Sequence, residues 1–322
     1  MKTYSKFNSS KSAIIATSLA KAHLCLLSYL LYFFSTYCVC AGEWQRHDVN
    51  TFTDFGSIIW DGSKYIIVGG GGTILTSDDA VTWNSTPPVT PAALFQITKG
   101  RKGYVAIGEK VGQGGGVILR SNDGYEWSFV RDAPLIAGLA WGKGKFVVGG
   151  TVAKGLIMSS ADGFQWSKTR LSRFAFLTEV EYSPLKRRFV ALSLGNRIFY
   201  SNSLSVWAST RIDYTLRDVA WGGSQFVAVG ASGATVSSRN GVTWNYSYVG
   251  SAHDLESVAW SGERFLAVGW TFTGYTLRES IDGIHWTEAF SGPNPGIPRA
   301  VCWGNGKFIV VGDNGFVGTY VP

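Results

Sequence analysis

The chain has 322 residues, of which 40 are glycine and 13 are tryptophan, and only 16% are charged. Lys and Arg outnumber Asp and Glu by 29 to 22. High hydrophobicity with little charge excludes a disordered chain, and irregularly spaced glycines exclude collagen. A coiled coil would be rich in Ala, Glu, Lys and Leu. The composition instead indicates a turn-rich β protein that is large enough to bury a core.

Residues 1–41 form a segment of their own, with four lysines and no acidic residue. An uncharged apolar run over 24–34 leads to the small residues Val39 and Ala41, which is the order of a secretory signal peptide. The uncharged stretch 22–41 is also long enough for an N-terminal membrane anchor. We therefore predict an exported protein (periplasmic, extracellular or cell-surface), with cleaved signal and anchor as alternatives.

Removing this segment changes the charge and cysteine arguments. The other residues carry 25 basic and 22 acidic side chains, because all four charges of the segment are lysines. A nearly balanced chain predicts no nucleic-acid partner. Membrane contact is expected only if the segment is retained. Three of the four cysteines also lie in it, so Cys302 is left without an internal disulfide partner.

The rest of the chain, residues 42–322, consists of seven copies of one unit. The copies at 218–230, 257–269 and 300–312 align without gaps, each with a Trp five residues before a Phe. Two units are degenerate, with Thr98 and Tyr182 in place of the Trp. Each unit has four strand-like runs, and a period of about 40 residues is typical of a propeller blade.

The seventh unit stops at Pro322 before its fourth strand. Trp44 precedes Trp83 by one period, so residues 43–49 are expected to supply the missing strand. The predicted fold is therefore all-β: a seven-bladed β-propeller of four-stranded antiparallel blades over 42–322, closed by an N-terminal strand that completes the last blade. Closure removes an exposed sheet edge.

A Ser-x-Asp-Gly-x-x-Trp pattern links the third and fourth strands of several units. It resembles the Asp-box (BNR) repeats of sialidase-type propellers, and the whole unit is similar to the repeats of the photosystem II assembly factor type. The resemblance covers residues 43–322. It implies that the Ser, Asp, Gly and Trp of the turn pattern have a structural role. Asn-, Asp- and Ser-type side chains satisfy backbone N–H groups in such turns. The best-matching positions are Ser121, Asp123, Trp127, Ser160, Asp162, Trp166, Ser280, Asp282 and Trp286.

Motifs for chemistry are not found. The histidines after residue 41 have no zinc spacing, and the sequence contains no calcium loop, nucleophile elbow or P-loop. We therefore expect no catalytic residue, no metal and no cofactor. A sialidase would need an arginine trio, a Tyr–Glu pair and an Arg-Ile-Pro element early in the chain, and here the similar string 296–299 is reversed and late.

In a propeller, the connections between the second and third strands and between blades gather on one face, which we call the loop face. Five tryptophans mark first strands and seven mark fourth strands, which leaves one of the 13, Trp270. It lies with Phe272 and Tyr275 in the predicted loop of unit six, either as a binding surface or packed over a neighbouring loop. Arg197, Arg217 and Arg299 are expected near the same face and suit an anionic ligand or an acidic patch.

These observations favour an exported, non-catalytic propeller, expected to be a monomer, that binds a protein partner or a glycan through its loop face. The alternative is a secreted glycan-active hydrolase of sialidase-like fold, which would need two facing carboxylates at the channel mouth. Help in assembling a membrane complex is a third possibility, which the family resemblance implies.

Overall fold

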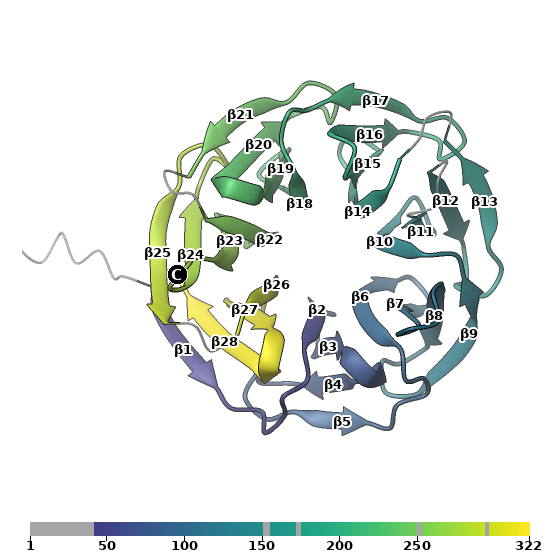
Figure 1. Cartoon of the computed structure of the whole chain (residues 1–322), viewed down its shortest axis with the longest axis horizontal. Helices are drawn as coiled ribbons and strands as arrows, with labels where there is room; N and C mark the ends of the chain where they lie inside the picture. The colour runs from purple at the N-terminus through teal and green to yellow at the C-terminus, as the bar shows by residue number, and fades with distance from the viewer. Residues whose placement is uncertain (1–41, 151–154, 172–174, 250–252, 294–295) are drawn as a thin grey trace, which may run out of the picture. The chain divides into compact units, whose positions relative to one another are not determined.

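The computed structural model describes residues 42–150, 155–171, 175–249, 253–293 and 296–322, and the predicted leader lies outside them. These residues form seven four-stranded antiparallel sheets around a central channel (Figure 1). The prediction of an all-β, seven-bladed propeller is confirmed. Short 3-10 turns, η1 (Gly70–Gly72), η2 (Ala231–Gly233) and η3 (Asp313–Gly315), follow three of the second strands.

The strands of blades 1 to 6 run in chain order from the channel outward, and in blade 7 the N-terminal strand is outermost. The first strands are β2 (Phe55–Trp60), β6 (Ala93–Gly100), β10 (Ile136–Gly142), β14 (Leu177–Ser183), β18 (Leu216–Gly222), β22 (Asp254–Trp260) and β26 (Pro298–Gly304). The second strands are β3 (Tyr65–Gly69), β7 (Gly103–Glu109), β11 (Lys145–Gly150), β15 (Arg188–Ser193), β19 (Gln225–Gly230), β23 (Phe265–Trp270) and β27 (Lys307–Gly312). The third strands are β4 (Ile74–Ser77), β8 (Gly116–Ser121), β12 (Leu156–Ser160), β16 (Arg197–Ser201), β20 (Ala234–Ser238), β24 (Gly274–Ser280) and β28 (Phe316–Val321). The fourth strands are β5 (Asn84–Thr86), β9 (Trp127–Ala133), β13 (Ser167–Arg170), β17 (Ala208–Arg211), β21 (Asn245–Tyr248), β25 (Thr287–Pro293) and β1 (Glu43–His47).

The N-terminal strand closes the ring as predicted. β1 pairs with β28 in antiparallel register from Glu43↔Val321 to His47↔Val317 (Figure 1). Trp44 stacks on the ring of Phe290 in blade 6, with 5.6 Å between ring centroids. The seventh blade is therefore held both by its sheet hydrogen bonds and by aromatic packing against its neighbour.

The core lies between blades, because the second strand of a blade is buried on both faces. The aromatic residue opposite the first-strand Trp position is buried in each of these strands, fully so at Phe226 and Phe265. The first-strand Trp packs over the preceding blade. A Cβ atom on Gly222 would lie 2.1 Å from the Trp260 ring, so only glycine, which has no side chain, fits at this position.

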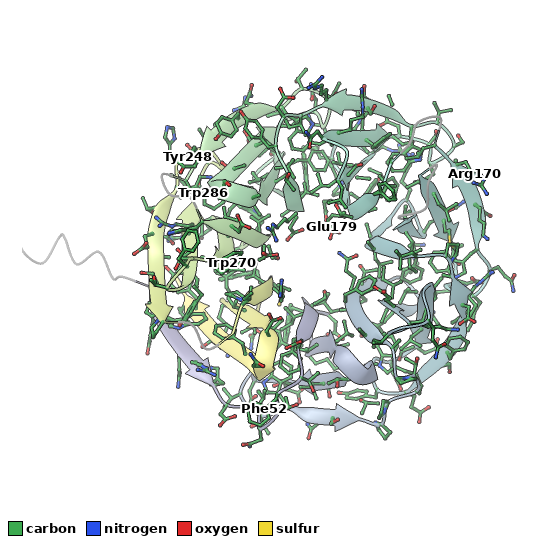
Figure 2. All side chains as sticks on the ribbon, in the orientation of Figure 1. Phe52, Arg170, Glu179, Tyr248, Trp270 and Trp286 are labelled. Carbon is green, nitrogen blue, oxygen red and sulfur yellow. The ribbon has the colours of Figure 1, made fainter. Side chains whose placement is uncertain are left out.

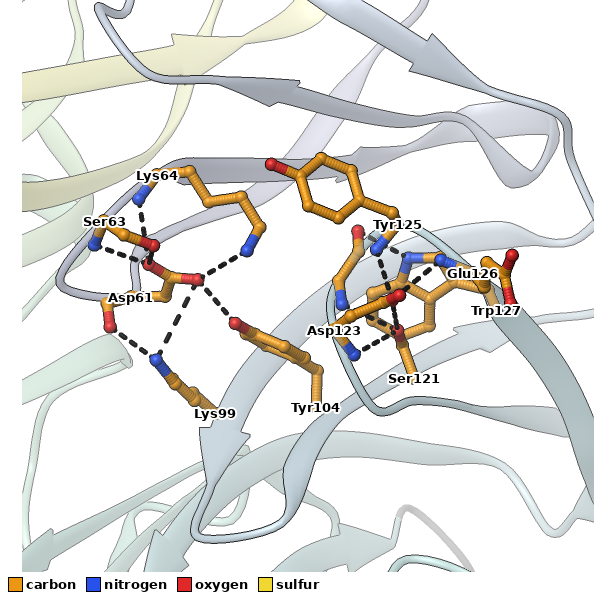
Figure 3. Close-up of polar contacts among 11 residues, drawn as sticks. Asp61, Ser63, Lys64, Lys99, Tyr104, Ser121, Asp123, Tyr125, Glu126 and Trp127 are labelled. Carbon is orange, nitrogen blue, oxygen red and sulfur yellow. Dashed lines mark hydrogen bonds and ion pairs between the residues drawn. The ribbon is translucent and has the colours of Figure 1, made fainter.

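Blade 2 departs from this pattern, and blade 1 compensates. The register puts Lys99, rather than Thr98 as the sequence alignment had it, at the tryptophan position opposite Tyr104. Asp61 of blade 1 stands where the other blades have Gly or Ser, and its backbone oxygen accepts from Lys99 Nζ at 2.6 Å (Figure 3). Burial opposes ionisation of Asp61, but hydrogen bonds from Tyr104 and Lys64 hold its pKa below the usual range.

The Ser-x-Asp-Gly turns use their polar groups internally (Figure 3). Asp123 Oδ1 accepts the N–H groups of the two residues after Gly124, at 2.8 and 2.9 Å, and Ser121 Oγ accepts the N–H of Gly124 at 2.8 Å. These backbone donors lower the pKa of Asp123. The equivalent turns at Asp162 and Asp282 have the same carboxylate and hydroxyl bonds. Each carboxylate therefore stabilises its own turn.

Replacing the closing tryptophan should loosen blade 7. We expect Trp44→Ala to lower the free energy of unfolding by about 2–4 kcal/mol, because a partly buried indole and its contacts with blade 6 are lost. Gln45→Ala, an exposed position on the same strand, should have little effect. Chemical denaturation would measure both, and equal stability of the two variants would contradict this account of closure.

A methyl group at the interblade glycine should also destabilise the ring. We expect Gly222→Ala to cost about 1–3 kcal/mol by forcing the Trp260 ring away from blade 5. Gly195→Ala provides the control, because a Cβ there would make only an ordinary contact at 3.5 Å. Thermal unfolding of the two variants tests the difference, and a normal melting temperature for Gly222→Ala would be the contrary result.

Candidate functional site at the mouth of the central channel

All seven first strands contain a β-bulge near their beginning. The register shifts between Leu216 and Asp218 in β18, between Leu255 and Ser257 in β22, and at the equivalent point of the other first strands. A bulge inserts one residue and re-aims a side chain. First strands begin at the loop face, so the bulged residues gather at that mouth of the channel. In blades 5, 6 and 7 they are Arg217, Glu256 and Arg299.

Glu256 is the centre of a charged cluster that joins these three blades. Its Oε1 accepts from Arg217 at 2.6 Å and from Trp270 Nε1 at 2.9 Å, and its Oε2 lies 3.9 Å from Arg299. Arg217 also pairs with Asp254. We call these residues, with Asp313, the mouth cluster.

Asp313 completes the mouth cluster from the connection after β27. Its two carboxylate oxygens accept from Arg299 Nε and Nη2, both at 2.8 Å. This charge-assisted pair raises the pKa of Arg299, against the opposing effect of burial. Both arginines of the mouth cluster are thus already bound to carboxylates of the chain itself.

The structure separates the residues that the sequence grouped together. Trp270, at the end of β23, joins the mouth cluster. Phe272 is 97% exposed in the next connection. Tyr275 lies in β24 and is only 5% exposed, and its hydroxyl accepts from Trp44 Nε1 at 2.9 Å, so its expected place in a loop is wrong. Arg197 contacts Ser209 within blade 4 and is apart from the mouth cluster.

The channel below the mouth is a cavity of about 510 Å³ lined by the first strands of all seven blades. Four of its lining residues are acidic. One is Glu256 of the mouth cluster, and the other three are Glu179, Glu181 and Asp218, which we call the channel acids. Figure 2 places Glu179 beside the central channel. Glu179 accepts from the Gln96 side chain, and Asp218 accepts from Ser257 Oγ at 2.7 Å. Blades 2, 4, 5 and 6 thereby contribute polar groups to one space.

Burial raises the pKa of all three channel acids. The pKa of Glu181 rises to about 8, and the nearby charge of Asp218 adds to the effect of burial. The pKa of Glu179 is raised by burial and then by Asp218 and Glu181. Hydrogen bonds from Ser257 and two backbone N–H groups oppose the rise at Asp218. Proximity of like charges and removal from water act in the same direction here.

Sequence reasoning did not identify Glu256, Asp218, Glu179 or Glu181 as site residues. Aligning the seven bulge positions would have grouped Arg217, Glu256 and Arg299, because they are equivalent residues of consecutive repeats. Within the described ranges, no group of three or more His, Cys, Asp and Glu residues is arranged to hold a metal ion. In the same part of the chain, no helix is long and apolar enough to cross a membrane.

Solved structures with similar folds have different names and low sequence identity. Virginiamycin B lyase from Staphylococcus aureus has a TM-score of 0.74 at 12% identity, with 87% of this chain and 99% of that chain covered. YCF48 bound to a D1 peptide has a TM-score of 0.67 at 15% identity, with 87% and 97% covered. The WD40 propeller domain of Doa1 also has a TM-score of 0.67, at 14% identity, with 87% and 97% covered.

These similarities show the propeller fold. No protein-family model matches the chain, and no curated protein matches its sequence. Membership of the Asp-box repeat family therefore stays a prediction that rests on the turn residues alone.

The channel acids predict a particular dependence of stability on pH. Glu181 holds its proton up to about pH 8 in the folded protein, against a usual pKa of 4.5, so the folded state binds more protons between these values. Stability should therefore fall as pH rises from 5 to 8. Glu181→Gln should flatten this fall in melting temperature, whereas the exposed control Glu263→Gln should follow the wild type. Parallel curves for all three proteins would contradict the assignment.

Proposed function

We propose that the protein is an exported, non-catalytic recognition propeller that binds a protein partner or a glycan at its loop face. One observation carries this proposal. Phe272 and Phe52, at 97% and 91% exposure, are the most exposed large apolar side chains among the described residues, and both lie in loop-face connections. Exposed aromatic side chains offer a large apolar contact area to a partner. Neither belongs to the repeated turn pattern, so the architecture itself does not require them.

The surroundings of the two phenylalanines suit binding. Phe52 borders a cavity of about 580 Å³ between the end of β1 and the connection after β27, lined also by Arg46, Asn50 and Asn314. Phe272 follows Trp270, which the mouth cluster holds in place. A pre-ordered rim lowers the entropic cost of binding. The sector from blade 6 through blade 7 to blade 1 therefore supports recognition best.

The proposal predicts that the exposed phenylalanines matter for binding but not for stability. The full chain should capture a partner or glycan that Phe272→Ser binds at least tenfold more weakly, with an unchanged melting temperature. Ile281→Ser is the matched control, since Ile281 is 76% exposed in a turn on the opposite face. Quantitative binding to glycan arrays and to partners captured from the native host would measure this. Equal losses for both variants, or none, would contradict a loop-face site.

A glycan-active hydrolase is the second candidate, and Glu181 is the observation that favours it. A carboxyl group that keeps its proton near neutral pH is suited to act as a general acid. Turnover of a panel of sialosides and other glycans by the wild type, lost in Glu181→Gln, would support this candidate over the first.

A further inference from the structure

Both arginines of the mouth cluster are paired with carboxylates, whereas the acids of the channel have no cationic partner. Arg217 is bound by Asp254 and Glu256, and Arg299 by Asp313. These two arginines are the basic residues among those that line the channel. Their guanidinium groups are engaged with carboxylates at the mouth, and the described lining contains no other cationic side chain.

The channel acids have no such partner. Glu179, Glu181 and Asp218 form no ion pair with any Lys, Arg or His of the ranges that the structure describes. Asp218 is the best satisfied, because its oxygens accept from Ser257 Oγ at 2.7 Å and from two backbone N–H groups at 2.7 and 2.8 Å. Glu179 accepts from Gln96 and from one backbone N–H at 2.9 Å. Burying carboxylates without a cation is unfavourable.

A second, independent observation concerns neutral polar atoms of the same wall. Gln96 Oε1 and Thr178 Oγ1 are buried and have no hydrogen-bond partner in the described part of the molecule. Both residues line the channel, and Thr178 occupies the bulge position of blade 4, next to Glu179. Buried polar atoms without partners are rare in folded proteins. The wall also contains one buried donor without a partner, Arg217 Nε, but the two unpartnered atoms beside Glu179, Gln96 Oε1 and Thr178 Oγ1, can both accept from an incoming donor.

We propose that the channel binds a primary ammonium or guanidinium group, which enters from the loop face and donates to Glu179, Glu181 and the acceptors beside them. Such a group supplies several donors and a positive charge at once. The inference rests on the proposed function and names the chemistry of its ligand: a partner segment whose Lys or Arg side chain reaches into the channel. An incoming cation also offsets the repulsion among the channel acids.

This ligand chemistry has two sources, a side chain of a polypeptide and a free amine. The probes for the first are the pentapeptide Gly-Gly-Lys-Gly-Gly and its neutral match with norleucine in place of lysine. The probes for the second are 1,5-diaminopentane and the neutral 1,5-pentanediol. Calorimetric titration of the full chain compares each cation with its match. Tighter binding of the peptide indicates a polypeptide ligand, and equal or tighter binding of the diamine indicates a free amine.

Two variants test the site itself. We expect Glu179→Gln and Glu181→Gln each to weaken binding of the cationic probes at least tenfold, with folding checked by melting temperature. Glu263 is exposed in the turn after β22, so the control Glu263→Gln should bind the probes as the wild type does. Failure of both cations to bind saturably overturns the inference. So does equal binding of the neutral matches, or unchanged affinity in both glutamine variants.

The same variants separate this inference from the proposed function. If Phe272→Ser loses the native partner while Glu179→Gln and Glu181→Gln retain it, the loop face binds the partner and the cation site is wrong. If none of the three substitutions weakens the binding of any ligand that the wild type binds, the proposed function fails as well.

Discussion

The pairing of β1 with β28 is the interaction on which the rest of the structure depends. It joins the two ends of the described chain, Glu43 beside Val321, and so closes a loop of nearly the whole domain. Such closure is entropically costly, and the cost grows only slowly with loop length. The sheet hydrogen bonds and the contacts of Trp44 with blade 6 offset it. Without this pairing, β28 would be an exposed sheet edge.

Once the ring is closed, a single repeated irregularity builds the candidate site. The bulge in each first strand turns one residue per repeat toward the same mouth, so the seven positions form a circle. Their side chains differ from blade to blade. Gly56 and Phe95 stand there in blades 1 and 2, whereas Thr178, Arg217 and Glu256 stand in blades 4 to 6. At the bulge positions, a symmetric backbone thereby carries polar side chains in blades 4 to 7 but not in blades 1 and 2.

The fold was predictable because its determinants are local and repeated. Tryptophan spacing and Asp-Gly turns mark each blade, and Trp44 one period before Trp83 identified the closing strand. A one-residue uncertainty was enough to misplace single side chains, since neighbouring residues of a strand face opposite ways. That is how Thr98 was aligned in place of Lys99, and how Tyr275, the second residue of β24, was placed in a loop.

The site was less predictable because its contacts join residues of different repeats. Arg217 and Glu256 are 39 residues apart, and Glu179 and Gln96 are 83 apart across the channel. The sequence predicts Arg197, Arg217 and Arg299 near the loop face, where they would suit an anionic ligand. In the structure, carboxylates of the chain itself already bind Arg217 and Arg299. The carboxyl groups without a cation lie deeper, in the channel, so the electrostatic energy available to a ligand is there. Exposed Phe272 at the rim offers apolar contact area, and the channel acids offer selectivity for charge.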